Sequence, residues 1–215
     1  MKDTTETPAV PVADGADQPL QAKAPRRSRG VKRVETLLAA AEQLFAEIGY
    51  GATSMNAIAQ RAGAPVGSLY QFFPSKVAIG GALVDRYAAD LQQAWREACM
   101  KVPRGNWPAF ADGLIAATLE CIGRHPAFAT LDEAQAQVHL RPNSQGEFEV
   151  ELMKLVAAAA GEEPDERHRL VAIVALQILK SAYALHRRGA GSLQDVRDEI
   201  ALIMKSYFQA KFADA

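Results

Sequence analysis

A three-residue turn, Gly63-Ala64-Pro65, constrains the fold of this chain more than any other feature. On each side of the turn lies a short segment whose apolar residues recur at helical spacing, and in the second segment these residues are Leu69 and Phe73. Such spacing predicts a helix that buries one face. Two short helices joined by a glycine-containing turn are typical of a helix-turn-helix, which we expect over roughly Val34 to Lys76.

The helices around this turn have recognisable ends. A longer first helix ends at Gly49, because glycine readily adopts the conformation that terminates helices. The second helix starts at Thr53 or Ser54, whose hydroxyls are good N-caps. The third helix covers about Val66–Phe73, and Pro74-Ser75 ends it and caps the next one. The first helix has an apolar stripe made of Val34, Leu37, Leu38, Ala41, Leu44, Phe45 and Ile48.

Helical spacing also prevails in the rest of the chain. A long connecting helix follows, with apolar residues four apart from Ile79 to Trp95. Prolines and glycines then separate five further helices, near 107–124, 127–139, 145–160, 165–187 and 192–211. No segment alternates as a strand does, and there is no internal repeat. The sequence therefore predicts an all-α fold of about nine helices, with an N-terminal three-helix helix-turn-helix domain and a C-terminal helical domain.

Charge divides the chain into three segments. Residues 1–25 carry a net charge of −2 without helical periodicity, and we expect a disordered tail there. Residues 26–80 hold seven Arg or Lys against three Glu, whereas residues 81–215 carry −3. A basic segment beside an acidic one favours a DNA-binding head, residues 26–80 with a basic arm at the start, on a separate helical body, residues 81–215.

Polar residues around the turn suit contacts with DNA. The hydroxyls of Thr53 and Ser54 lie at a helix start, where they can hold a phosphate. Tyr70 and Lys76 can donate to phosphate oxygens. Two alternatives to these phosphate contacts remain open: Tyr70 can be a half-buried packing residue, and Lys76 can be a solvated lysine. The basic arm can neutralise phosphates or simply keep a tail soluble, and it consists of Arg26, Arg27, Arg29, Lys32 and Arg33.

The third helix carries the residues that can read bases. Gly67 removes bulk from the helix face and permits close approach to a groove wall. Ser68 can donate to a base edge or a phosphate. Gln71 can pair with an adenine edge, and Phe72 can contact a thymine methyl group. Because Leu69 and Phe73 face the core, Tyr70 and Gln71 are expected to face outward.

The pattern Leu69-Tyr70-x-x-Phe73-x-x-Lys76, with Thr53 and Ala59-x-x-Ala62-Gly63 before it, resembles the tetracycline-repressor (TetR, AcrR-type) family of transcription regulators. The resemblance covers about residues 34–85. It implies phosphate contacts by Thr53, Tyr70 and Lys76, and entry of residues 66–72 into the major groove. Val66 stands where a polar residue is often found, so we expect an apolar contact with thymine. The resemblance also implies that residues 81–215 bind an effector and dimerise.

The body supplies candidates for both of these roles. The segment 165–187 is apolar nearly all round and the last helix has an apolar seam, so two helices from each subunit can form a four-helix interface or pack within one monomer. The interface candidates are Ile178, Val196, Ile200, Ile203 and Tyr207. The pocket candidates, which are equally compatible with an ordinary core, are Trp95, Trp107, Phe110, Cys121 and Phe128.

Other classes of protein lack support in the sequence. Cys99 and Cys121 do not have metal-site spacing and favour buried thiols in a reducing cytosol. His125 and His139 lack a third ligand at helical spacing, so no metal and no cofactor are expected. No apolar run is long enough to span a membrane, and no signal peptide is recognisable, so a cytoplasmic protein is expected.

The sequence thus favours a DNA-binding transcription regulator over two alternatives. We expect a homodimeric repressor that binds a palindromic operator and is released by a small-molecule effector. A helical enzyme with an incidental basic arm is one alternative, but no Gly-rich phosphate loop, nucleophile elbow or Glu-x-x-His pair is present. A protein-binding helical adaptor is the other. Salt-dependent binding to duplex DNA distinguishes the first reading from both.

Overall fold

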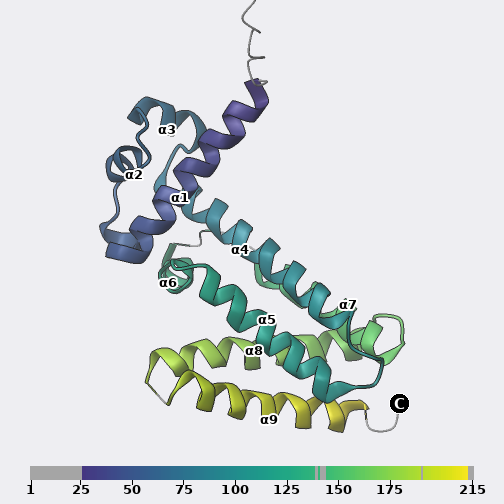
Figure 1. Ribbon diagram of the computed structural model, residues 1–215. Helices are drawn as coiled ribbons and strands as arrows, with labels where there is room; N and C mark the ends of the chain where they lie inside the picture. Colours follow the sequence, from purple (N-terminus) through teal and green to yellow (C-terminus); the bar gives the residue numbers. More distant parts are fainter. Residues whose placement is uncertain (1–25, 139, 141–143, 190, 213–215) are drawn as a thin grey trace, which may run out of the picture.

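The computed structural model describes residues 26–212 except 139, 141–143 and 190 (Figure 1), so the predicted tail, 1–25, and His139 lie outside the described residues. The described part is all-helical, as predicted, and contains nine helices and no strand. These are α1 (Arg26–Ala52), α2 (Met55–Arg61), α3 (Val66–Phe72), α4 (Lys76–Cys99), α5 (Trp107–Arg124), α6 (Phe128–Val138), α7 (Ser144–Ala160), α8 (Glu166–Arg187) and α9 (Leu193–Phe212).

Helices α1, α2 and α3 form a head at one end of the molecule (Figure 1). The stripe on α1 is buried from Leu37 to Phe45, whereas Ile48 is 51% exposed. Gly49, with φ 84° and ψ 157°, interrupts α1 where the sequence predicts its end, and the helix resumes to Ala52. At the other end, α1 begins at Arg26, eight residues before Val34. The predicted basic arm is therefore the first two turns of this helix.

Two hydrophobic clusters lie along the molecule, and α4 contributes to both. Ile79, Leu83 and Tyr87 of α4 pack into the head cluster, while Trp95 packs into the body cluster. The head cluster also contains α6 residues, including Leu131, because α6 packs against α1. Residue 80, where the sequence divides head from body, lies inside α4. The division into domains remains a prediction.

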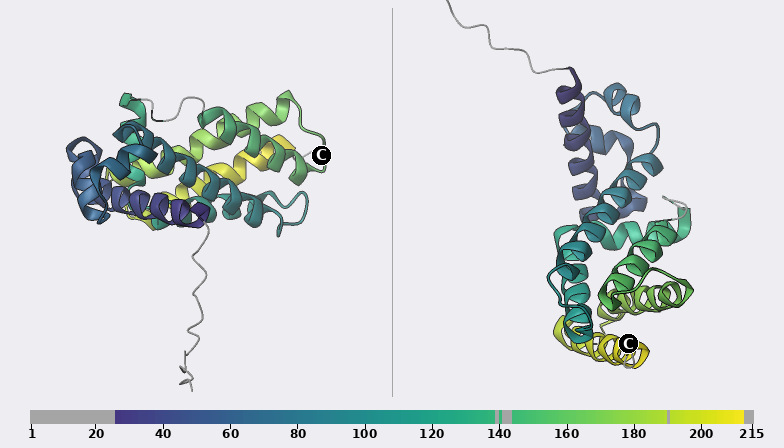
Figure 2. Two further views of the ribbon diagram at one scale, coloured as in Figure 1. Left: turned by 90° about the horizontal axis from the view of Figure 1, so that it is seen from above. Right: turned by 90° about the vertical axis from the view of Figure 1, so that its right-hand side faces the viewer.

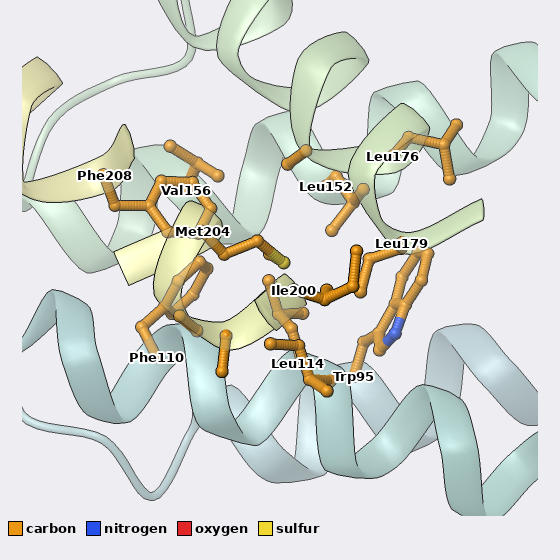
Figure 3. Packing of buried hydrophobic residues seen from close by; sticks show 14 of the residues in the cluster. Trp95, Phe110, Leu114, Leu152, Val156, Leu176, Leu179, Ile200, Met204 and Phe208 are labelled. Carbon is orange, nitrogen blue, oxygen red and sulfur yellow. The ribbon is translucent and has the colours of Figure 1, made fainter. Parts of the chain in front are cut away.

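The body is a helical bundle that ends in α8 and α9 (Figure 2, right). These two helices run side by side and pack against α7 and α5 respectively. Ile200 and Met204 of α9 point into the middle of the body cluster, among Leu114, Val156 and Leu179 (Figure 3). Among the described residues, no helix is long and apolar enough to cross a membrane.

Candidate DNA-binding surface

Helix α3 is held by two buried residues and turns the rest of its surface outward. Leu69 is fully buried and Phe73, at the C-cap, is 8% exposed. Val66, Tyr70 and Phe72 are 39%, 49% and 40% exposed, which is unusual for large side chains on one two-turn helix. A short helix with an apolar anchor and an uncovered face suits insertion against a partner surface.

The smaller residues predicted to face DNA also lie on α3, and they differ in exposure. Gln71 and Gly67 are exposed, and Ser68 is half-buried. A Cβ atom added at Gly67 would meet nothing within 4 Å, so the space beside this residue is open. The surface therefore combines polar donors with apolar groups, which is what base edges in a major groove require.

The turn before α3 and the start of α2 are built as the sequence indicates. Ser54 is the N-cap of α2, and its Oγ accepts a hydrogen bond of 3.1 Å from the Ala57 amide. Gly63 has a φ of 58°, a conformation that favours glycine. The Ala64 amide donates to the Ala59 carbonyl at 2.9 Å and so closes the end of α2.

An ion pair fixes α2 against α1. Both terminal nitrogens of Arg61 donate to the carboxylate of Glu47, at 2.9 and 2.7 Å. The hydrogen bond from Arg61 lowers the pKa of Glu47. The bidentate geometry gives the pair a defined orientation even at an exposed site. Sequence reasoning missed this pair, because its partners are 14 residues apart and no local spacing marks them.

The ammonium of Lys76 is turned toward the protein's own backbone, and the phosphate contact expected for it stays a prediction. Its Nζ donates to the carbonyls of Tyr50, Gly51 and Thr53, at 2.7, 3.0 and 2.9 Å. Burial lowers the pKa of Lys76. The carbonyls of Tyr50 and Gly51 lie in the last turn of α1 and that of Thr53 just after it, where backbone carbonyls lack helical partners and a cation satisfies them well. A contact of this ammonium with phosphate would require breaking these bonds.

Thr53 also differs from its predicted role. Its side chain is buried, and its hydroxyl donates to the Gly49 carbonyl at 2.8 Å. The residue therefore closes the break in α1 and does not present its hydroxyl to solvent. Ser54, next to it, is exposed and stays a candidate for a phosphate contact. Of the basic residues at the start of α1, Lys32 is exposed and Arg33 is half-buried, whereas the side chains of Arg26, Arg27 and Arg29 lie outside the described residues.

The pocket candidates do not gather into one site. Trp95, Trp107 and Phe110 are buried in the body cluster, where Trp95 Nε1 donates to Thr118 Oγ1 at 2.8 Å. Phe128 instead packs against the head cluster and stacks on Tyr87, with 6.5 Å between the ring centroids. Cys121 is buried, and burial raises its pKa. The candidates are therefore divided between the body cluster and the head cluster, because α6, which carries Phe128, packs against α1.

The interface candidates differ in how far they are buried within this chain. Val196 and Ile200, only 5% and 1% exposed, are buried inside this chain's own body cluster, which corrects their assignment to a surface between subunits. Ile178 and Tyr207 are half-buried at the edge of this cluster. Ile203 is 49% exposed and Leu202, its neighbour, is 62% exposed. The uncovered face of α9 is thus the 202–203 face.

The helix-turn-helix segment matches a known family. Residues 37–83 match the family model described as bacterial regulatory proteins, tetR family. Over 48 residues the chain is 52% identical to an uncharacterized HTH-type transcriptional regulator, YxaF, of Bacillus subtilis (strain 168). The matched segment is 22% of this chain and spans a quarter of that relative's length.

Solved structures share the fold over most of the chain. A TetR-family transcriptional regulator from Streptomyces coelicolor is 24% identical, with a TM-score of 0.66 over 83% of this chain and 98% of its own. A putative transcriptional regulator from Pseudomonas aeruginosa PAO1 is 18% identical, with a TM-score of 0.68 over 88% and 96%. A TetR-family regulator from Pectobacterium atrosepticum is 20% identical, with a TM-score of 0.67 over 88% and 99%.

Proposed function

We propose that this chain, whose residues 37–83 match the tetR family of bacterial regulatory proteins, acts as a homodimeric repressor, which a small-molecule effector releases from a palindromic operator. The observation that carries the proposal is the uncovered surface of α3, on which Tyr70, Gln71 and Phe72 are all exposed. A helix with such a face, seated on a rigid three-helix head, is suited to enter a major groove.

The contacts of α3 have different expected roles. Gln71 reads an adenine edge, and Phe72 and Val66 make apolar contacts with thymine methyl groups. Tyr70 and Ser54 donate to phosphates and hold the head in register. The inward-turned Lys76 supports this surface indirectly, because it ties the start of α4 to the end of α1.

The dimer is proposed to form through the uncovered sides of α8 and α9. Leu170 on α8 is 59% exposed, and Leu202 and Ile203 on α9 are 62% and 49% exposed. Large apolar side chains on two neighbouring helices favour a self-complementary interface. A two-fold dimer would place two α3 helices about 34–36 Å apart, or a multiple of it, to match two half-sites.

An effector that releases the DNA is proposed to bind in the body, away from the DNA-binding helix α3. The aromatic part of the body cluster, with the Trp95–Thr118 hydrogen bond inside it, is where a small and largely apolar molecule would act. Thermodynamic reciprocity requires that such a molecule weaken DNA binding by the same factor by which DNA weakens its own binding.

Selection of bound duplexes from a random pool tests the proposal. We expect a palindromic consensus and an affinity that falls with salt, with a slope of roughly −0.9 for each phosphate neutralised. Removing residues 1–29 should reduce this slope without changing the consensus. Light scattering at micromolar concentration should give the mass of a dimer. A protein that binds all duplexes equally, or none, contradicts the proposed function.

A further inference from the structure

His125 lies where the head, α4 and the body meet. It is the C-cap of α5, and its two ring nitrogens face carboxylates on two other helices. Nδ1 lies 3.5 Å from Glu42 Oε1 on α1. Nε2 lies 3.1 Å from Asp90 Oδ2 on α4, which is within ion-pair distance, but the two atoms are not aligned for a hydrogen bond. The ring also stacks on Tyr87 of α4, with 4.0 Å between centroids.

The site is shielded from solvent and polar at its centre. The His125 and Glu42 side chains are 11% and 17% exposed, whereas that of Asp90 is 43% exposed. Glu42 Oε1 also accepts a hydrogen bond of 2.6 Å from the Tyr87 hydroxyl. Burial, followed by the bond to Glu42, raises the pKa of Tyr87 far above its usual range, so this hydroxyl remains a donor at all ordinary pH values.

Other charged groups surround the site. On α4, Arg86 pairs with Glu35 of α1 at 2.6 Å and adds a positive field at Tyr87. On α5, the charges of Arg124 and Glu120 act on Cys121, one turn before His125. The set thus combines two guanidinium groups, Arg86 and Arg124, with the carboxyl groups of Glu35, Glu42, Asp90 and Glu120. Within this set, an imidazole is the group whose ordinary titration falls near neutral pH.

We propose that His125 is a pH-sensitive tie between the DNA-binding head and the body, in which the protonated ring holds Glu42 of α1 and Asp90 of α4 together against the end of α5. A neutral imidazole has one N–H, so one of the two carboxylates must face a ring lone pair. The imidazolium has two N–H groups and a positive charge, and it favours both carboxylates at once.

The sign of the effect follows from this preference. The tied arrangement binds the proton better than an arrangement in which the head has moved away, so acid favours the tie. The contribution is therefore larger at acidic than at alkaline pH. Since a fixed head needs less ordering to meet an operator, protonation should also tighten specific DNA binding. This second consequence rests on the proposed function, whereas the tie itself does not.

A double-mutant cycle tests the tie without DNA. Urea unfolding of wild type, Glu42→Gln, His125→Gln and the double variant is measured near pH 6 and near pH 8. We expect the coupling of the two residues to change the unfolding equilibrium about threefold to tenfold near pH 6 and to vanish near pH 8. If Glu42→Gln fails to fold, Asp90→Asn, at a more exposed residue, replaces it. Equal coupling at both pH values, or none, overturns the proposal.

Operator binding tests the consequence for function, with a matched control. His168 is a second histidine between carboxylates, 2.6 Å from Asp165 and 3.2 Å from Glu162, but it lies at the start of α8. We expect wild type and His168→Gln to bind operator several-fold more tightly near pH 6 than near pH 8, and His125→Gln to lose most of this difference. The same pH dependence in His125→Gln overturns the link to DNA. A wild type that binds no duplex contradicts the proposed function and leaves the unfolding cycle to decide on the tie.

Discussion

Lys76 Nζ donates a hydrogen bond to the Tyr50 carbonyl at 2.7 Å and lies 4.6 Å from the centroid of the same residue's ring. Tyr50 belongs to the end of α1, and Lys76 is the first residue of α4. A single ammonium therefore joins the helix that carries the head's apolar stripe to the helix that leads into the body.

Replacing Lys76 with methionine should destabilise the fold. The substitution leaves two carbonyls at the end of α1 and that of Thr53, just after it, without their donor. We therefore expect a loss of about 1–3 kcal/mol in the free energy of unfolding, measured by urea denaturation. Lys32→Met, at an exposed lysine on α1, is the control and should change stability little. Unchanged stability together with equal weakening of operator and random DNA would instead favour the phosphate role predicted from the sequence.

Gln71→Ala should weaken operator binding more than binding to a scrambled duplex. If Gln71 makes a bidentate contact with adenine, its loss costs roughly 1–3 kcal/mol per half-site. Paired titrations at fixed salt measure the difference. Gln209→Ala, at an exposed glutamine on α9, is the control and should leave both affinities unchanged. Equal weakening of both duplexes by Gln71→Ala would make Gln71 a backbone contact.

Ile200 and Ile203, less than one turn apart on α9, should respond to substitution in different ways. Ile200→Ala opens a cavity in the body cluster and should lower the free energy of unfolding by about 2–5 kcal/mol. Ile203→Arg adds a charge to the exposed face, so it should leave the fold intact and shift the mass in light scattering from dimer toward monomer. A dimer that persists in Ile203→Arg would place the interface elsewhere.

Gly81→Ala should destabilise the protein although alanine is the better helix former. A Cβ at residue 81 would lie 2.8 Å from the Leu140 carbonyl oxygen, so the backbone there must move. The control, Gly123→Ala in α5, meets nothing within 4 Å and should gain up to about 1 kcal/mol from helix propensity alone. Thermal unfolding compares the two variants, and a stabilised Gly81→Ala would show that this close approach is not maintained in solution.

Much of the fold follows from local sequence signals. The stripe on α1, the cap at Ser54, the turn at Gly63 and the buried pair Leu69 and Phe73 all lie where periodicity and turn chemistry predict them. Helix bounds beyond residue 100 agree within one or two residues with the predicted ranges. These features depend on residues a few positions apart, and helical geometry alone relates such residues.

The tertiary structure decided which polar and apolar groups meet. The sequence shows a lysine at the start of α4, but only the packing of α4 on α1 brings it to the carbonyls 23 to 26 residues earlier. It shows a seam on α9, but only the position of α5 and α8 buries Ile200 and leaves Ile203 outside. The sequence likewise gives no sign of the partners of Arg61 and His125. Such pairings arise from the way helices dock, which depends on the shapes of whole surfaces and leaves no local pattern in the chain.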